Sequence, residues 1–254
     1  MIRAFSLALL FLTRIPVPLW FNPTPLEWGR SALFFPVVGL LLGLLLAIPA
    51  ALLANLDAGV VAALLLTWWV ALTGGLHLDG LADTADAWVG GGGHREKTLA
   101  IMKDSRSGPM AILAVVLVLL NKFAALRWLL LQQDWLVLLA VPVLGRAAML
   151  FLLLTTPYVR PGGIGAAYAS HLPRAACIWL LLGGGVLGLW LFGWSGAVLL
   201  SVLSLKLFWW RRLLLRRLGG TTGDTLGAAG ELTETVALMI LTLLNTTGFA
   251  SRII

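Results

Sequence analysis

Charged residues are scarce in this chain of 254 residues, where they make up only 11% of the sequence. A soluble domain carries roughly 25% charged residues, so the composition excludes an ordinary soluble protein. The single cysteine, Cys177, excludes a disulfide framework and a metal site built from several thiolates. Acidic residues are rarer than basic ones, with 11 Asp and Glu against 18 Lys and Arg. Any cluster of acidic residues therefore needs an explanation.

Long apolar runs take the place of charge, since 60% of the residues are hydrophobic and the mean hydropathy is +0.97. About seven segments approach the roughly 20 residues that a helix needs to cross a bilayer. They are 31–54, 58–78, 109–131, 134–156, 176–193, 195–210 and 232–249. Short alternating strands of the kind found in membrane barrels are absent. We predict an all-α fold, a polytopic transmembrane helical bundle that forms a single integral-membrane catalytic domain over residues 1–254.

The first residues, MIRAFSLALLFLTRIPVPLW, resemble a signal peptide, but no small-x-small cleavage site follows the apolar stretch. We expect a retained short helix that is interfacial or re-entrant. Short links at 55–57, 132–133 and 193–194 predict three hairpins, which places the longer loops 79–108, 157–175 and 211–231 on one side. These loops hold most of the basic residues, and only Arg252 lies clearly opposite. By the positive-inside rule, that side is cytoplasmic, together with the amino terminus. The +7 net charge then reflects topology, and we expect no nucleic-acid partner.

The stretch GGLHLDGLADTADAWVGGGG, residues 74–93, places three aspartates at the edge of an apolar run. Asp79, Asp83 and Asp86 share one stripe of a helix, which the flanking glycines would begin and end. Like charges at this spacing repel, so the stripe is unfavourable near lipid unless a cation neutralises it. One or two carboxylates plus substrate phosphates are typical of Mg²⁺ sites. We predict a magnesium site, with a solvated helix face as the alternative. His77, just before the stripe, is a candidate base or ligand, or else a cap.

Two further segments carry polar groups. In REKTLAIMKDSRSGPMA, Lys103 and Arg106 flank Asp104, and Ser107 can cap a helix beginning at Pro109; this is a phosphate cradle or an ordinary basic loop. GGTTGDTLGAAGELTETVALM opens the last span and lacks the GxxxxGK[ST] pattern, which excludes a P-loop nucleotidase. Its Asp224 and Glu231 share a helix face, with Glu234 about 60° around. Carboxylates entering a span are costly, which favours a functional role over capping.

Cations inside the predicted spans complete the pattern. Lys122 and Arg146 lie deep enough to face the bundle interior, where they would neutralise the acidic residues or bind phosphate. Arg127 can instead extend to the membrane surface. Arg160, within YVRPGGIGA, is another candidate anion contact. Acidic residues for a divalent metal and basic residues for phosphate suit phosphoryl transfer, which depends on charge neutralisation and positioning.

Several of these stretches resemble the cobalamin synthase family over nearly the whole chain, in the same order. They are FLTRIPVP, LHLDGLADTADAW, IMKDSRSGPMA, Gly145–Arg146, RPGGIGAAY and GGTTGDTLGAAGELTE. The aspartate motif also resembles that of the CDP-alcohol phosphotransferases. However, Asp83 stands where that pattern has arginine, and its second aspartate pair is missing. A lipid synthase of that kind is the alternative enzyme, and a transporter is the alternative from another class.

The resemblance implies the joining of adenosylcobinamide-GDP to α-ribazole, or its 5′-phosphate, with release of GMP and dependence on Mg²⁺. It also implies a multi-pass protein of the bacterial inner membrane, surrounded by the lipid bilayer. Whether the protein forms a homo-oligomer is left open. The metal ligands we expect are Asp79, Asp83, Asp104, Asp224 and Glu231. The candidate catalytic groups, one of which takes the hydroxyl proton, are His77, Asp86 and Glu234. The expected phosphate or substrate contacts are Lys103, Arg106, Arg146 and Arg160.

Overall fold

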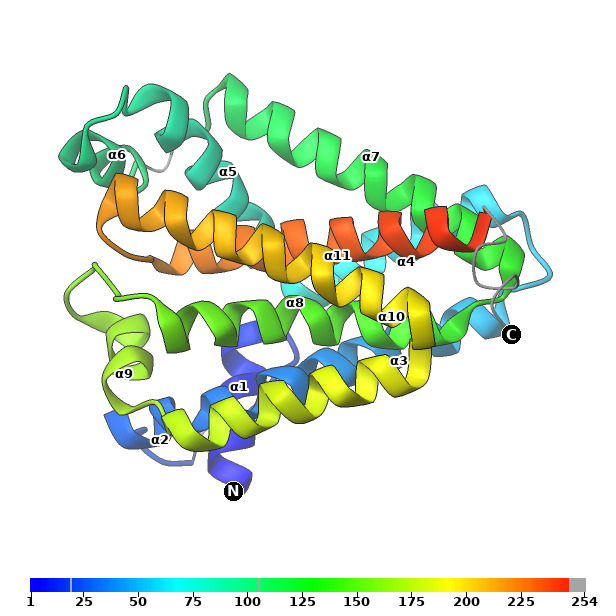
Figure 1. The fold of residues 1–254 in the computed structure, drawn as a ribbon, viewed down its shortest axis with the longest axis horizontal. Helices are drawn as coiled ribbons and strands as arrows, with labels where there is room; N and C mark the ends of the chain where they lie inside the picture. The colour runs from blue at the N-terminus through cyan, green and yellow to red at the C-terminus, as the bar shows by residue number, and fades with distance from the viewer. Residues whose placement is uncertain (19, 105, 247–254) are drawn as a thin grey trace.

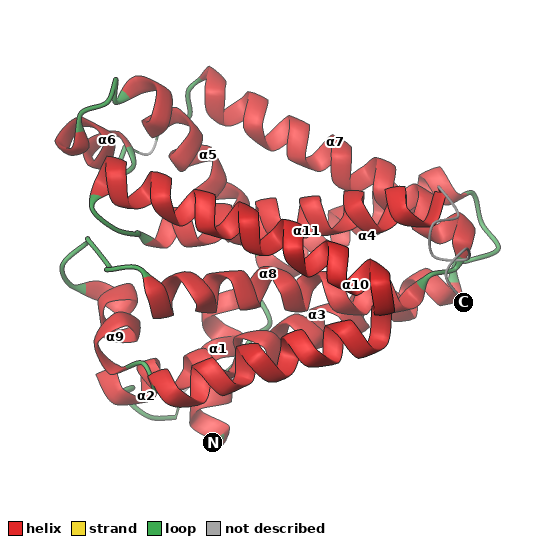
Figure 2. Cartoon of the chain, in the orientation of Figure 1, coloured by secondary structure: helices red, strands yellow, loops and turns green. Residues whose placement is uncertain are grey.

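A computed structural model describes residues 1–18, 20–104 and 106–246, and helices form almost all of the regular structure in these ranges (Figure 2). The described residues contain no strand, so the predicted all-α fold is confirmed. The helices are α1 (Ile2–Leu12), α2 (Pro25–Ser31), the 3₁₀ helix η1 (Ala32–Phe34), α3 (Phe35–Leu52), α4 (Ala58–Thr73), α5 (Leu76–Gly90), α6 (Arg95–Ile101), α7 (Pro109–Gln132), α8 (Trp135–Thr155), α9 (Gly163–His171), α10 (Arg174–Leu218) and α11 (Gly223–Thr246).

Five helical stretches of the described chain are long and apolar enough to cross a membrane, and α4 with α5 forms a further, bent candidate. The five are Pro25–Leu52, Pro109–Gln132, Trp135–Thr155, Arg174–Leu218 and Gly223–Leu244. Helix α10, which is the stretch Arg174–Leu218, reverses direction at Gly193 (Figure 1). The φ of 52° and ψ of −128° at Gly193 are not helical. The two arms of α10 therefore correspond to two of the predicted spans. The predicted multi-pass bundle is confirmed.

Three predicted span boundaries were wrong. The span 58–78 ends at Thr73, because Gly74 and Gly75 take positive φ angles of 63° and 67° and α5 leaves α4 at 87°. The span 195–210 continues to Leu218 as the second arm of α10. The last span was expected to begin at residue 232, but α11 begins at Gly223. Residues 247–249 of that span, and Arg252, lie outside the described residues.

The connections are arranged as the pairing into hairpins predicted. Figure 1 shows the α3–α4 turn, the α7–α8 turn and the reversal of α10 at one end of the bundle. The longer connections around α6, α9 and the start of α11 lie at the other end. The amino-terminal helix α1 is too short to cross a bilayer and runs across the direction of the long helices (Figure 1). We call the end that carries the long connections the loop end.

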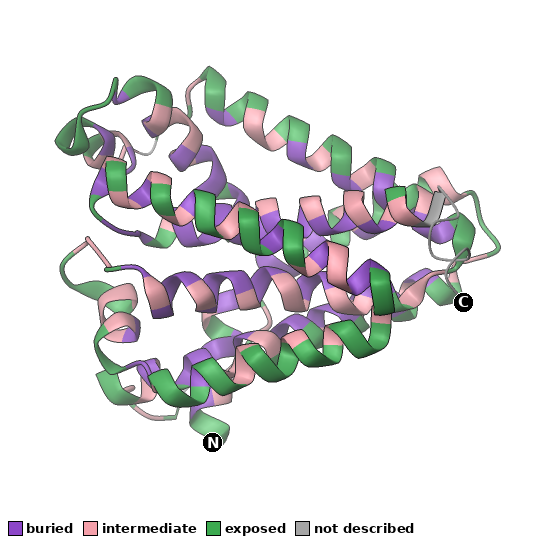
Figure 3. Cartoon of the chain, viewed as in Figure 1, coloured by how far each residue is buried: buried purple, intermediate pink, exposed green. Residues whose placement is uncertain are grey.

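Glycines set the closest helix packing in the bundle. A Cβ at Gly39 or Gly43 of α3 would lie 2.6 Å from a backbone oxygen of α8, so only glycine permits this approach. Small residues at a spacing of four are a common way to pack helices within a membrane. Buried residues face the inside of the bundle, while large apolar residues such as Leu64, Leu120 and Trp190 are exposed on its outside (Figure 3). The outer surface is therefore suited to lipid.

Candidate active site

Helices α5 and α11 bring the two acidic segments of the sequence together. A Cβ at Gly80 of α5 would lie 2.8 Å from the backbone oxygen of Asp224. A Cβ at Gly227 of α11 would lie 3.2 Å from the Cα of His77. The helices can touch at both points only because glycine has no side chain. The two acidic segments, which are far apart in the sequence, therefore lie against each other.

The open part of this site holds three aspartates and one arginine. Asp79 is exposed, and Asp83 and Asp224 are half-buried. The carboxylate of Asp83 is repelled by those of Asp79 and Asp224 and attracted by the guanidinium of Arg160. Arg160 donates to Asp224 across 2.7 Å and to the carbonyl of Met102 across 3.2 Å. This cluster is more negative than its one arginine can balance, which favours a cation.

The oxygen donors of this open cluster are the type that Mg²⁺ prefers. In the described part of the chain, however, no three His, Cys, Asp or Glu side chains are grouped closely enough to hold a metal by themselves. This arrangement does not fit a metal cage made of protein alone. It fits a Mg²⁺ held by one or two carboxylates and completed by phosphate oxygens of a substrate, which is the usual way for proteins to bind this ion.

The third aspartate of the stripe, Asp86, has a different environment. Its carboxylate accepts hydrogen bonds from the backbone N–H groups of Gly108 and of Ala111, the latter at 2.9 Å. These N–H groups belong to the first turn of α7, where backbone donors have no partner within the helix itself. The expected cap by Ser107 was wrong, because the helix begins after Gly108 without a cap from its own segment. Asp86 thus ties α5 to the start of α7.

The loop before α7 holds the remaining predicted contacts with phosphate. Asp104 accepts a hydrogen bond of 2.7 Å from Arg106, which lowers the pKa of the Asp104 carboxyl to about 2. Lys103 and Arg106 are both exposed. The neighbouring Met102 is buried, and its carbonyl is the group that Arg160 contacts. The loop is therefore anchored beside the acidic cluster while its cations stay accessible.

A second group of charges is buried below the open cluster. Lys122 of α7 donates to Glu231 at 2.7 Å and to Glu234 at 2.5 Å, both on α11. Arg146 of α8 also pairs with Glu234 and lies 3.5 Å from Nδ1 of His77. All five residues are between 1% and 4% exposed. We call these five residues the buried charge network.

The buried charge network joins four helices and has two cations for two carboxylates. Such pairs are stable only when the charges are matched, because leaving one unpaired away from water is costly. Lys122 and Arg146 were expected either to neutralise acidic residues or to bind phosphate. The ion pairs show that they neutralise acidic residues. Two of its buried nitrogens, Nε2 of His77 and Nε of Arg146, have no hydrogen-bond partner among the described residues. The predicted catalytic and metal roles of His77, Glu231 and Glu234 are not tested by these contacts.

Some polar contacts were not predicted. Lys206, on the second arm of α10, is largely buried and donates to the carbonyl of Ala229 at 3.0 Å and to the hydroxyl of Thr233 at 2.7 Å. A lone lysine within a predicted span was the available signal. Three arginines on α6 and α10 donate to carbonyls at the ends of other helices, where a cation is favourable. They are Arg95, Arg174 and Arg211, which contact Leu218, Leu154 and Thr155.

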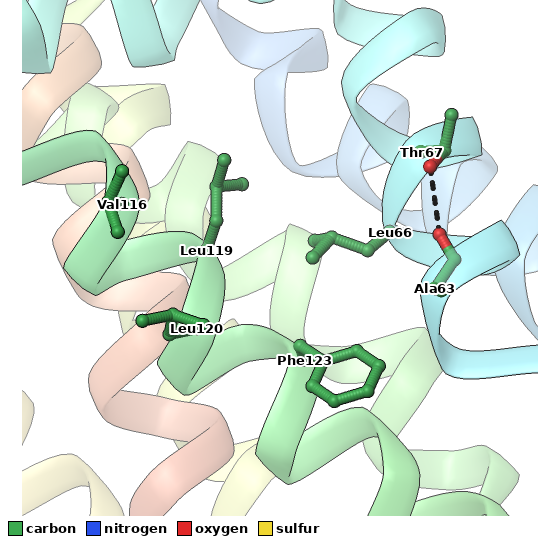
Figure 4. Close-up of a pocket in the computed structure, with 7 residues that line it drawn as sticks. All are labelled: Ala63, Leu66, Thr67, Val116, Leu119, Leu120 and Phe123. Carbon is green, nitrogen blue, oxygen red and sulfur yellow. Dashed lines mark hydrogen bonds between the residues drawn. The ribbon is translucent and has the colours of Figure 1, made fainter. Parts of the chain in front are cut away.

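One groove of about 340 Å³ lies between α4 and α7 (Figure 4). It is lined by Ala63, Leu66, Thr67, Val116, Leu119, Leu120 and Phe123. The hydroxyl of Thr67, the one polar side chain of this lining, is bonded to the carbonyl of Ala63 at 2.8 Å. The groove therefore offers no chemistry for catalysis.

Comparison with known proteins gives consistent matches along the chain. Residues 4–242 match the family model described as cobalamin-5-phosphate synthase. An adenosylcobinamide-GDP ribazoletransferase of Pseudomonas entomophila (strain L48) is 58% identical over 244 residues, covering 94% of this chain and 98% of that protein. Proteins of the same name from Pseudomonas putida (strain W619) and Ectopseudomonas mendocina (strain ymp) are 57% and 56% identical, covering 94% and 93% of this chain and 98% and 97% of their own lengths. No solved structure matches.

Proposed function

Because the chain belongs to the cobalamin-5-phosphate synthase family, we propose that it joins adenosylcobinamide-GDP to α-ribazole, or to its 5′-phosphate, and releases GMP. The support is the name shared by relatives that are 56–58% identical and cover nearly the full chain. The reaction belongs to the assembly of the nucleotide loop of cobalamin. The open acidic cluster is the place we assign to it.

The proposed step is a phosphoryl-group transfer. A ribose hydroxyl oxygen of ribazole forms a bond to the phosphorus attached to cobinamide. The bond from that phosphorus to the oxygen bridging to GMP breaks, and GMP leaves with this oxygen. The hydroxyl proton passes to a base on the protein. Because negative charge gathers on the leaving phosphate, such a reaction requires mainly positioning and charge neutralisation.

The observation that carries the assignment is the contact of α5 with α11, which gathers aspartates from two segments beside an arginine. We propose that one or two of the carboxylates of Asp79, Asp83 and Asp224 hold Mg²⁺ together with the diphosphate of the substrate. When bound, the ion would polarise phosphate oxygens and offset their charge. Asp104 and Glu231 remain predicted ligands, and either would first have to leave its cation, Arg106 or Lys122.

The cations near the open cluster suit the nucleotide. Arg160 is directly beside Asp224, and we propose that it contacts the diphosphate with Lys103 and Arg106 of the neighbouring loop. A guanidinium can bind two phosphate oxygens at once, which also orients the group. Arg146 is the fourth predicted contact. Because it is buried and paired with Glu234, we propose that it acts on the substrate through the buried charge network.

Among the three candidate bases, His77 fits best. Its Nε2 has no hydrogen-bond partner among the described residues, and it can accept a proton in the tautomer that carries its hydrogen on Nδ1, which requires the 3.5 Å contact of Nδ1 with Arg146 to open. The carboxylates of Asp86 and Glu234 are already bonded to backbone amides and to cations, respectively. We therefore propose His77 as the base and keep Asp86 and Glu234 as alternatives.

We further propose that the loop end faces the cytoplasm in the bacterial inner membrane. The long connections gathered there carry most of the arginines and lysines, as the positive-inside rule requires of a cytoplasmic side. This orientation places the open acidic cluster on the cytoplasmic side. Attaching a membrane-impermeant reagent to single cysteines at the two ends of the bundle tests it.

The test of the function is a product assay with the purified protein in lipid vesicles, supplied with adenosylcobinamide-GDP, α-ribazole and Mg²⁺. We expect GMP and the joined product, and loss of both with a chelator. Asp83→Asn should lower the rate by about 100-fold or more, as expected for a charge that stabilises the transition state. The matched control is Asp57→Asn, because Asp57 caps α4 through the amide of Val60 and asparagine caps equally well.

Three outcomes of these assays would each contradict a different part of the proposal. If Asp83→Asn keeps the full Mg²⁺-dependent rate while remaining folded, the metal assignment is wrong. If the wild-type protein releases CMP from CDP-diacylglycerol but no GMP from the cobinamide nucleotide, the reaction is that of a lipid synthase. Cation flux through vesicles that depends on Asp83 would instead support a transporter.

A further inference from the structure

The second arm of α10 carries a continuous stripe that ends in two arginines. Leu205, Phe208 and Trp209 are 70%, 57% and 58% exposed, and Arg212 and Arg216 are exposed as well. At about 100° per residue, all five lie within one side of the helix. The outer side of this arm is exposed along its length in Figure 3. The stripe therefore runs from an apolar to a basic surface along one face.

An exposed tryptophan indicates how deep this stripe lies in a membrane. Trp194 begins the arm and is 53% exposed, and Trp209 is the next exposed tryptophan along it. At roughly 1.5 Å per residue, they are about 22 Å apart, less than the roughly 30 Å of a hydrocarbon core, so they do not mark both interfaces. Trp209, which the two arginines follow, marks the interface at the loop end. Arg212 and Arg216 then lie about 5 Å and 11 Å beyond Trp209, at the level of lipid headgroups.

The neighbouring arginines show that this exposure is specific to one face. Arg211 donates to the carbonyl of Thr155 at 3.0 Å. Arg217 donates to Thr98 and to the carbonyl of Trp88. By contrast, neither Arg212 nor Arg216 takes part in an ion pair or side-chain hydrogen bond within the described residues. The four arginines of the segment RRLLLRR, residues 211–217, thus comprise two that hold helices together and two that face outward.

We propose that Arg212 and Arg216 bind the headgroup phosphate of an anionic phospholipid such as phosphatidylglycerol. The two guanidinium groups, one helical turn apart, can donate to the same phosphate. The acyl chains of that lipid would lie along Leu205, Phe208 and Trp209, the apolar part of the stripe. A free phosphate ion would use the arginines alone and leave this apolar surface without a role. The occupant we assign is therefore the lipid.

The test measures displacement of a fluorescent phosphatidylglycerol from the purified protein in detergent micelles. Removing one arginine near a membrane surface should weaken the binding about fivefold, and Arg212→Gln with Arg216→Gln should weaken it about 30-fold. The matched control is Arg127→Gln, an exposed arginine of α7 near the opposite end of the bundle, which should bind as the wild type does. Arg212→Lys with Arg216→Lys should keep most of the affinity. None of these residues belongs to the proposed catalytic site, so the result is independent of enzymatic activity.

Several outcomes would overturn the proposal. One is equal lipid binding by the double glutamine variant and the wild type. Another is equal binding of phosphatidylcholine and phosphatidylglycerol by the wild type. A third is displacement of the lipid by inorganic phosphate at equal concentration, which would assign the site to a free anion. If the double variant fails to fold, the two single glutamine variants give the same comparison with smaller changes.

Discussion

Gly80 of α5 lies against the backbone of Asp224 of α11, with space for a hydrogen atom but not for a methyl group. A Cβ at this position would be 2.8 Å from the Asp224 oxygen and 2.9 Å from its Cα. Because both contacts are with backbone, no side-chain rotation can relieve them. The distance between the aspartates of α5 and Asp224 therefore depends on this glycine.

Replacing Gly80 by alanine should push α5 and α11 apart and lower the rate of product formation by about 10- to 100-fold, since displacements of about 1 Å have such effects on catalysis. The matched control is Gly183→Ala on α10, where an added Cβ meets nothing within 4 Å. That variant should keep the wild-type rate. Rates measured in vesicles, at equal amounts of folded protein, check the prediction. An active Gly80→Ala variant would show that the contact does not matter for catalysis.

The buried charge network predicts a large loss of stability when Lys122 is removed. Lys122→Met leaves Glu231 without a partner, whereas Glu234 keeps Arg146. Breaking a buried pair in this way costs about 3–5 kcal/mol of the free energy of unfolding. Denaturant unfolding in mixed micelles measures this change. Arg127→Met, an exposed cation on the same helix, should change the stability by about 0.5 kcal/mol or less.

A double variant distinguishes unpaired charge from lost packing. Adding Glu231→Gln to Lys122→Met removes the unpaired carboxylate, so more than half of the lost stability should return. If the double variant is as unstable as Lys122→Met alone, the loss comes from the packing of Lys122, including its contact 4.3 Å above the ring of Trp69, and not from charge.

The helical topology could be predicted because a bilayer sets the length of an apolar helix and short links force neighbouring helices into hairpins. The end of α4 was harder to predict. Leu76 and Leu78 continue the apolar run, so hydropathy extended the span to residue 78. The break at Gly74 and Gly75, whose backbone is left-handed, was indicated by the glycines that were expected to begin the next helix, but hydropathy alone does not detect it.

The site could be predicted in part for a similar reason. Helical spacing shows which residues share a face of one helix, so the stripe on α5 and the carboxylates of α11 were recognisable. It does not show which helix lies opposite. The pairing of Lys122 with Glu231 joins residues separated by 109 positions, and the hydrogen bond from Gly108 to Asp86 joins residues separated by 22. Only the folded chain shows such partners.

Asp86 provides a test that separates capping from catalysis. Because its carboxylate holds two amides at the start of α7, Asp86→Ala should cost about 1–2 kcal/mol of stability, as the loss of a helix cap does. Asp86→Asn keeps one acceptor oxygen and should retain most of the activity. Hydrogen exchange at Gly108 and Ala111 reports the cap directly. An Asn variant with unchanged exchange but a 100-fold lower rate would instead identify Asp86 as the base.

Arg160 should have opposite effects on the metal and on the nucleotide, because its guanidinium attracts one and competes with the other. Pairing with Asp224 places a positive charge where we propose that Mg²⁺ binds. Arg160→Gln should therefore lower the Mg²⁺ concentration needed for half-maximal activity by several-fold, and raise KM for the cobinamide nucleotide by several-fold. Arg106→Gln, which removes an exposed partner of Asp104, should raise KM alone if the loop contacts only phosphate. If Arg160→Gln shifts both constants in the same direction, Arg160 maintains the shape of the site and does not bind the diphosphate.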